Sequence, residues 1–89
     1  MKNEEIKFGA KKILKKLSET YNDLEAFVFY NDEFEQYELV INSVYEENDE
    51  FVKTLNKLLI SEIISKKMYL YSYFTDEFEE MSSKYLYTD

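Results

Sequence analysis

The side chains that could do chemistry in this 89-residue chain are carboxylates, lysines, tyrosines and serines, since histidine and cysteine are both absent. Their absence excludes a zinc site built from cysteine and histidine, a disulfide scaffold and a histidine-based catalytic triad. A pair of carboxylates can supply a general acid and base, as in glycosidases, but 19 acidic residues make chance pairs numerous. The composition therefore predicts a protein that is not an enzyme and has no catalytic residues.

The segment 31–35 (Asn-Asp-Glu-Phe-Glu) superficially resembles a calcium-binding loop. An EF-hand loop places oxygen ligands at positions 1, 3 and 5 and a glycine at position 6. Counted from Asp32, position 3 is Phe34 and position 6 is Tyr37, so the pattern fails. We expect weak, non-specific cation binding at the acidic patches, but no dedicated metal site and no cofactor.

Charge is distributed very unevenly along the chain, whose formal net charge is −8. Residues 1–18 hold six lysines and two glutamates, whereas residues 19–50 hold eleven carboxylates and no lysine. Residues 51–67 are net basic again, and residues 68–89 are net acidic, with a second acidic cluster over 76–80. We therefore expect residues 19–50 to form one strongly negative surface.

The five lysines from Lys7 to Lys16 have two interpretations. They could contact phosphate groups or an anionic membrane, or they could form the solvent-exposed side of a helix. The chain has no arginine, whose planar guanidinium clamps phosphates and bases, and a net charge of −8 repels nucleic acid. We therefore expect neither direct nucleic-acid binding nor membrane binding.

The elements that must position these charges follow from the spacing of the apolar residues. A 3.6-residue period from Ile6 to Tyr21 predicts an amphipathic helix, in which Gly9 indicates a close packing contact. The segments 25–30 and 34–42 are rich in β-branched and aromatic residues and predict an antiparallel hairpin. Such a hairpin is marginally stable alone and has to pack on helices.

The second half of the chain predicts a helix, a strand and a helix. Asn48 caps the second helix, whose apolar residues from Phe51 to Ile64 form a broad arc, and Thr75 caps the last helix. Residues 68–74 alternate tyrosines and predict a third strand, although the second helix could instead continue through this segment. The sequence therefore predicts a single α+β domain over residues 1–89, in the order α-β-β-α-β-α.

The hairpin has a pattern of alternating faces. In its second strand the odd-numbered residues from Tyr37 to Ile41 alternate with the even-numbered residues from Gln36 to Val40, which predicts one buried and one mostly exposed face. Glu38 would then lie on the exposed face. Alternate strand residues are about 6.5–7 Å apart, similar to the spacing of phosphates along a nucleic-acid strand. A row of carboxylates on this hairpin could therefore occupy a basic nucleic-acid channel of another protein.

Localisation is predicted from segments that the chain lacks. The N-terminal residues contain no apolar stretch typical of a secretory signal, and no apolar run approaches the roughly 20 residues that span a bilayer. The absence of cysteine fits a reducing compartment. All of the basic residues are lysines and none is an arginine, and asparagine, isoleucine and tyrosine are frequent. This usage is typical of an AT-rich coding sequence. We therefore expect a protein of the bacterial cytoplasm, encoded by a low-GC bacterium or a mobile element.

The acidic residues fit two interpretations. In the first they only keep a small domain soluble, and those at 49, 50, 76 and 77 are explained by helix-start preferences. In the second they bind a basic partner, because aspartate and glutamate are usually depleted in strands, yet this hairpin contains four. Several of the nine tyrosines must also reach the surface, where tyrosine beside carboxylates is typical of an interface.

In size, acidity, aromatic content and element order the chain resembles small phage-encoded inhibitors of host defence, the anti-CRISPR and anti-restriction proteins that mimic nucleic acid. The residues that carry this resemblance, and that we predict to contact a partner, are Asp32, Glu33, Glu35, Glu38, Glu46, Glu47, Asp49 and Glu50, with the nearby aromatics Tyr37 and Tyr45. The resemblance implies a non-enzymatic inhibitor that docks on a basic protein, such as a nuclease or a CRISPR effector. The alternatives are a toxin-immunity protein, or a homodimeric or larger adaptor module in which the basic helix of one copy meets the acidic hairpin of another.

Overall fold

The computed structural model describes residues 2–85, which form a small α+β fold. In chain order the elements are α1 (Lys2–Thr20), β1 (Ala26–Asn31), β2 (Gln36–Asn42), the 3-10 helix η1 (Ser43–Tyr45), α2 (Asp49–Glu62), the 3-10 helix η2 (Ile64–Lys66), β3 (Tyr71–Thr75) and α3 (Phe78–Tyr85). The predicted order α-β-β-α-β-α is confirmed. None of the helices in residues 2–85 is long and apolar enough to cross a bilayer.

The segment after α2 leaves the helical path at Lys67. This residue has a left-handed backbone (φ 60°), its N–H donates to the carbonyl of Ile64, and the next N–H, of Met68, donates to the carbonyl of Ile63. These bonds satisfy carbonyls at the end of the helix. Helix C-caps commonly have this geometry, in which the left-handed residue is usually a glycine. The third strand is therefore confirmed, although it begins at Tyr71 rather than at residue 68.

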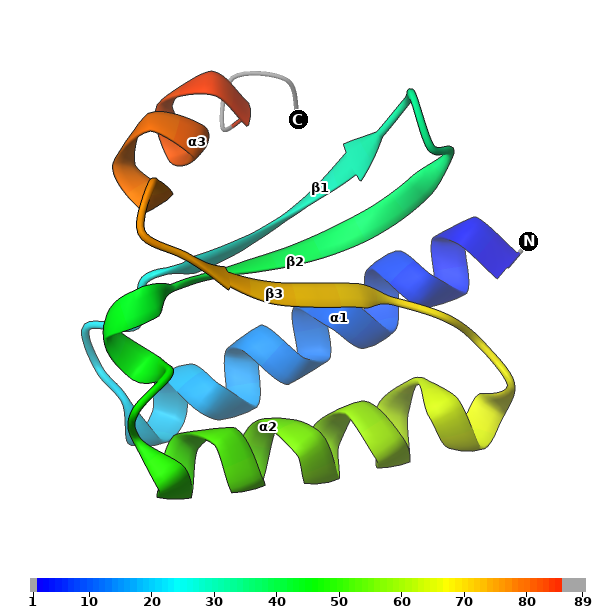
Figure 1. The fold of residues 1–89 in the computed structure, drawn as a ribbon. Helices are drawn as coiled ribbons and strands as arrows, with labels where there is room; N and C mark the ends of the chain where they lie inside the picture. The colour runs from blue at the N-terminus through cyan, green and yellow to red at the C-terminus, as the bar shows by residue number, and fades with distance from the viewer. Residues whose placement is uncertain (1, 86–89) are drawn as a thin grey trace.

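The three strands form one mixed sheet in the order β1-β2-β3, so that β2 is its central strand. β1 and β2 pair antiparallel, from Ala26 opposite Ile41 to Asn31 opposite Gln36. β3 pairs with the opposite edge of β2 and runs parallel to it, because α2 carries the chain back to the end of the sheet at which β2 begins. In Figure 1, α1 and α2 lie side by side under one face of the sheet, while α3 lies on the opposite side.

Both faces of β2 are buried as a result. Leu39 and Ile41 pack into the larger core with α1 and α2, whose fully buried residues include Ile13, Leu17 and Phe51. On the other face, Val40 packs with Phe27 and Phe29 under the α3 residues Phe78 and Met81. The prediction that one face of the hairpin is mostly exposed is therefore wrong, because α3 returns over that face.

The close contact predicted at Gly9 is confirmed at the crossing of α1 and α2. A Cβ atom placed on Gly9 would lie 2.9 Å from Cδ1 of Ile63 and 3.1 Å from the carbonyl oxygen of Glu62. Both distances are shorter than ordinary van der Waals contact. Glycine therefore allows the two helices to approach, despite its cost of roughly 1 kcal/mol in a helix interior relative to alanine.

Candidate functional site: two separate acidic surfaces

Folding concentrates opposite charges on opposite layers of the molecule. The helical segments 2–20 and 49–67 hold ten of the eleven lysines and six carboxylates. The remaining described segments, 21–48 and 68–85, hold twelve carboxylates and one lysine. Because α1 and α2 cover the same face of the sheet, the uneven charge along the sequence becomes a basic helical layer against an acidic layer that comprises the sheet, its loops and α3.

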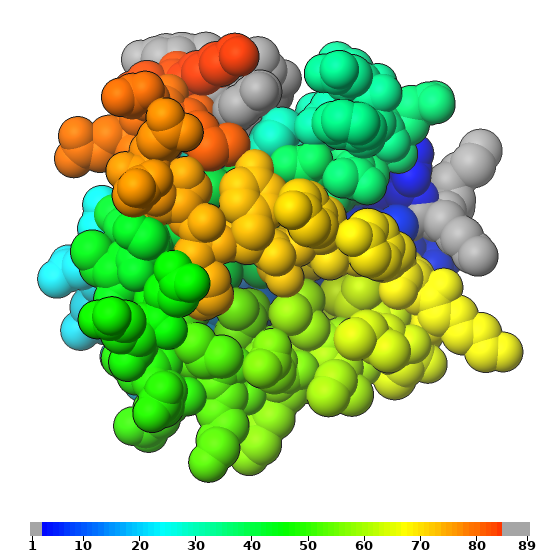
Figure 2. Space-filling model, viewed as in Figure 1, coloured from blue at the N-terminus to red at the C-terminus, as the bar shows by residue number. Residues whose placement is uncertain are grey.

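The larger acidic surface lies at the end of the sheet where β2 and β3 finish, and we call it the acidic end. Its ten exposed carboxylates are Asp23, Glu25, Glu46, Glu47, Asp49, Glu50, Asp76, Glu77, Glu79 and Glu80. They come from four segments: the α1–β1 loop, the η1–α2 connection, the start of α2, and the β3–α3 turn with the first residues of α3. Figure 2 shows these segments, in cyan, green and orange, adjoining on the left side of the molecule.

Specific bonds hold these four segments together. The hydroxyl of Tyr45 in η1 donates to the backbone carbonyl of Asp23 at 3.1 Å, and the N–H of Asn42 donates to the carbonyl of Glu25 at 3.0 Å. Asn42 is also the register partner of Thr75, so the last residues of β2 and β3 lie side by side. A pocket is lined by Asn42 at the end of β2 and by residues 76–80, which brings this acidic stretch against the last residue of β2.

Side-chain caps fix the backbone that carries the acidic end. The Asn48 side chain accepts from the N–H of Phe51 at 3.0 Å, which confirms the predicted cap of α2. The Asn42 side chain accepts from the N–H of Val44 at 3.1 Å, and the Thr75 hydroxyl accepts from the N–H of Glu77 at 3.0 Å. The carboxylates of this surface therefore project from turns whose backbone is already fixed.

The second acidic surface is the turn between β1 and β2, which we call the hairpin tip (residues 32–35). Asp32, Glu33 and Glu35 are all exposed there, and they surround Phe34, whose exposed fraction is 66%. The side-chain oxygen of Asn31 shapes the turn by accepting from the N–H groups of Glu33 and Phe34. Glu35 completes the turn with a left-handed backbone, at φ 50°.

The hairpin tip and the acidic end lie at opposite ends of the central strand. β2 is seven residues long, which separates them by about 20 Å at the usual rise of a strand. The prediction of one continuous acidic surface over residues 19–50 is therefore wrong. The structure brings Glu46, Glu47, Asp49 and Glu50 together with acidic residues from the two flanking segments, and it leaves the hairpin tip apart.

Glu38 belongs to neither surface, since it is only 5% exposed. Its Oε2 accepts from the side-chain amides of Asn31 at 2.9 Å and Gln36 at 3.0 Å, and its Oε1 accepts from the hydroxyl of Tyr73 at 3.0 Å. The expectation that Glu38 contacts a partner as part of an exposed row is therefore wrong. The central position of β2 places this carboxylate between two neighbouring strands, where it bonds to both.

The two tyrosines predicted to contact a partner are half-buried and packed on other rings. Tyr37 meets Tyr30 edge to face, with ring centroids 5.0 Å apart. Tyr45 stacks on the buried Phe51 at 4.6 Å and also meets Tyr21. These contacts give both rings a packing role, and the role of Tyr45 is to hold η1 against the end of α1.

An ion pair that sequence reasoning did not identify joins α1 to α2, with a buried carboxylate and two exposed lysines. The carboxylate of Glu62 lies 3.5 Å from Nζ of both Lys12 and Lys66. Burial raises the pKa of Glu62, but the two ammonium groups together outweigh burial and hold this pKa below its ordinary value of 4.5. One feature of the sequence points to this ion pair: Glu62 is the only carboxylate in residues 51–67, and it lies four positions before Lys66.

In residues 2–85 no three acidic, histidine or cysteine side chains are arranged to hold a metal ion. No family model matches the chain, and neither the curated proteins nor the solved structures contain a match. Function therefore has to be inferred from the charge, packing and surface shape of the chain itself.

Proposed function

We propose that this protein is a non-enzymatic binding protein whose acidic end docks on a basic surface of a nucleic-acid-handling protein, in place of nucleic acid. The observation that supports this proposal is the convergence of ten exposed carboxylates, from four separate segments, at one end of the sheet. Like charges brought together in this way repel one another in the folded state, so solubility alone does not require their convergence. On a basic partner, the attraction between the carboxylates and the positive charges of that partner would offset this repulsion.

The rigid backbone under the acidic end favours this role. The caps at Asn42 and Asn48 and the hydrogen bond to Thr75 fix the turns that carry the carboxylates, so that little backbone freedom is lost on binding. Complementary charge mainly accelerates association and selects the partner, and its effect is screened over about 10 Å at 0.1 M salt. We therefore expect fast association that is strongly weakened by salt.

The class of partner follows from the charge pattern that nucleic acid and the acidic end share. A nuclease, a restriction enzyme or a CRISPR effector holds its nucleic acid in a basic channel, and an inhibitor of anti-CRISPR or anti-restriction type would occupy that channel in the cytoplasm of a bacterial host. A toxin-immunity protein would use the same electrostatics against a basic nuclease toxin. The identity of the protein that is inhibited distinguishes these two roles.

The proposal is tested by competition with DNA. Purified bacterial nucleases and CRISPR effectors are titrated with the protein while their binding of labelled DNA is measured at low and high salt. We expect displacement of DNA from the cognate partner by the wild type, and loss of displacement in the triple variant Glu46→Lys, Glu47→Lys, Glu50→Lys.

The matched control reverses the same number of charges at the hairpin tip, in the variant Asp32→Lys, Glu33→Lys, Glu35→Lys. This variant should displace DNA as the wild type does, because its substitutions lie at the other end of β2. If the two triple variants lose displacement equally, net charge rather than the acidic end is responsible. If only the variant at the tip loses it, the docking surface is assigned to the wrong end.

A further inference from the structure

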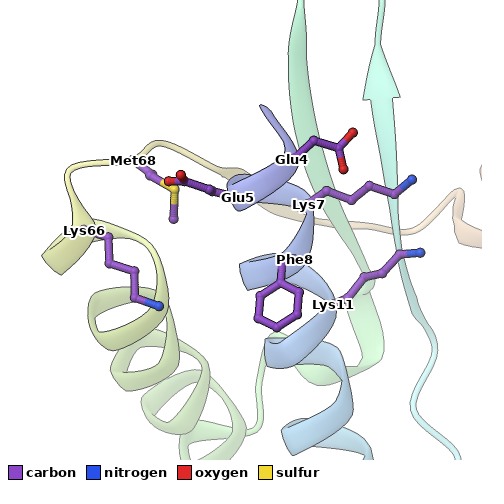
Figure 3. Close-up of a pocket in the computed structure, with 7 residues that line it drawn as sticks. All are labelled: Glu4, Glu5, Lys7, Phe8, Lys11, Lys66 and Met68. Carbon is purple, nitrogen blue, oxygen red and sulfur yellow. The ribbon is translucent and has the colours of Figure 1, made fainter. Parts of the chain in front are cut away.

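A groove lies at the opposite end of the molecule from the acidic end, between the first turns of α1 and the connection from α2 to β3. It has a volume of about 570 Å³ and is lined by the apolar side chains of Phe8 and Met68 and by charged residues of both signs: Glu4, Glu5, Lys7, Lys11 and Lys66. Figure 3 shows the ring of Phe8 in the middle, with Lys66 on one side and Lys7 and Lys11 on the other. The groove therefore combines two apolar side chains with three lysines and two carboxylates, and one of these lysines, Lys66, also pairs with Glu62.

Phe8 is the feature of this groove that the fold does not explain. Its exposed fraction is 70%, although the same helix buries Ile13 and Leu17 completely. Phe8 lines the groove together with Met68, and a contiguous exposed apolar patch rimmed by polar residues is typical of an interaction site. The ligand that fits would carry an apolar group to cover Phe8 and Met68, and several anions to meet the lysines.

The hairpin tip has this complementary chemistry. Phe34 is 66% exposed at the turn, and the neighbouring Asp32, Glu33 and Glu35 are exposed as well. Hydrogen bonds from the backbone to Asn31 hold the turn in shape, so that the aromatic ring and the carboxylates are presented on a fixed loop. An aromatic side chain that fills a pocket on a partner can carry much of the binding energy, and the charged residues around it form the rim of the interface.

We propose that the groove receives the hairpin tip of a second copy of this chain. Phe34 of one copy would pack on Phe8 and Met68 of the other, while the carboxylates of the tip meet the lysines of the groove. The tip lies toward the right of Figure 1, as do the first turns of α1 and the connection from α2 to β3 that line the groove, so two copies related by a two-fold axis can exchange tips reciprocally. The acidic end is at the other side and stays free for its proposed partner.

The first test is the mass of the full chain in solution, measured by sedimentation over a range of protein concentrations. We expect a dimer at low salt that dissociates at high salt, because the contacts around Phe34 are ionic. Phe34→Ala should raise the dissociation constant about tenfold or more, since it removes the aromatic anchor from its pocket. A wild type that stays monomeric at every concentration and salt would overturn the proposal, whether or not the groove binds a foreign acidic peptide.

The second test exchanges charges between the two surfaces. The tip variant Asp32→Lys, Glu33→Lys and the groove variant Lys7→Glu, Lys11→Glu should each be monomeric alone, because like charges then face each other. An equimolar mixture should form a heterodimer, since each reversed surface now finds its complement on the other variant. This recovery also shows that neither variant is merely unfolded.

A matched control carries the same charge change at the acidic end, in the variant Glu46→Lys, Glu47→Lys. It should dimerise as the wild type does. If the tip variant dimerises unchanged, or if the mixture of tip and groove variants does not associate, the assigned contact is incorrect. Because this experiment needs no foreign partner, its outcome is independent of the competition with DNA.

Discussion

The carboxylate of Glu38 accepts a hydrogen bond of 3.0 Å from the hydroxyl of Tyr73, 35 positions further along the chain. Asn31 on β1 and Gln36 on β2 donate to the same carboxylate. One acidic side chain therefore joins all three strands on the face that α3 covers in part. This bond also removes Glu38 from the acidic surface to which the sequence had assigned it.

We expect Glu38→Ala to lower the free energy of unfolding by about 2–4 kcal/mol, because three donors then lose their acceptor. Tyr73→Phe removes one of these bonds and should cost about 1–2 kcal/mol. Denaturant unfolding measures both changes. Glu33→Ala is the control, since this exposed carboxylate at the hairpin tip should change stability by less than about 0.5 kcal/mol. Equal effects of Glu38→Ala and Glu33→Ala would show that the network does not stabilise the sheet.

The ion pair of Glu62 with Lys12 and Lys66 predicts a specific dependence of stability on pH. The pKa of Glu62 is lower in the folded state than its ordinary value of 4.5, so the folded state binds the proton less readily. Its stabilisation is therefore fully present above pH 4.5 and is lost as the pH falls through the lower folded pKa.

Glu62→Gln isolates this contribution from that of the other carboxylates. The difference in unfolding free energy between wild type and Glu62→Gln should be largest near neutral pH and should shrink below pH 4.5. Glu79→Gln, at an exposed position of α3, removes one carboxylate away from this ion pair and serves as the comparison. A difference for Glu62→Gln that stays constant across this range would argue against the ion pair.

The contact of Gly9 with α2 predicts that alanine is unfavourable there, although alanine is the better helix former. Gly9→Ala gains about 1 kcal/mol in helix propensity but should lose about 1–3 kcal/mol from overpacking against Ile63 and the carbonyl of Glu62. We therefore expect a net loss of stability in thermal or denaturant unfolding.

Ile63→Val provides the matched background for this test, because it removes the Cδ1 atom that lies 2.9 Å from the new methyl group. In a double-mutant cycle Gly9→Ala should cost less in the Ile63→Val protein than in the wild type. Additive effects of the two substitutions would mean that the helices separate instead of clashing at this atom.

The left-handed backbone of Glu35 predicts a stabilising substitution at the hairpin tip. A residue with a Cβ atom pays roughly 1–2 kcal/mol for this conformation, which glycine adopts without strain. At φ 50°, Glu35→Gly should therefore raise the unfolding free energy by up to about 1 kcal/mol, since the flexibility of glycine offsets part of the gain. Glu33→Gly, in the same turn but without positive φ, should bring no gain, and a gain of equal size would exclude strain as the cause.

The sequence by itself determined those features that depend on neighbours a few residues apart. The 3.6-residue spacing identified the helices, the alternation of residues identified the strands, and Asn48 marked the start of α2, because periodicity and capping are local. The predicted cap at Thr75 is wrong, since α3 begins at Phe78 and the Thr75 hydroxyl accepts from Glu77 in the turn before it. Gly9 could be assigned to a close contact since a glycine inside a regular helix otherwise only costs stability. The separation of lysines from carboxylates was likewise visible in the order of residues.

Only the tertiary structure decided what lies on which side of the sheet. The parallel pairing of β3 with β2 and the return of α3 over the sheet depend on contacts between distant residues, and these together bury Glu38 and Val40. Alternation along one strand shows that two faces differ, but it does not show what covers each of them. The length of β2 then separates acidic residues that are close in sequence, and the crossing of α2 brings distant ones together at the acidic end.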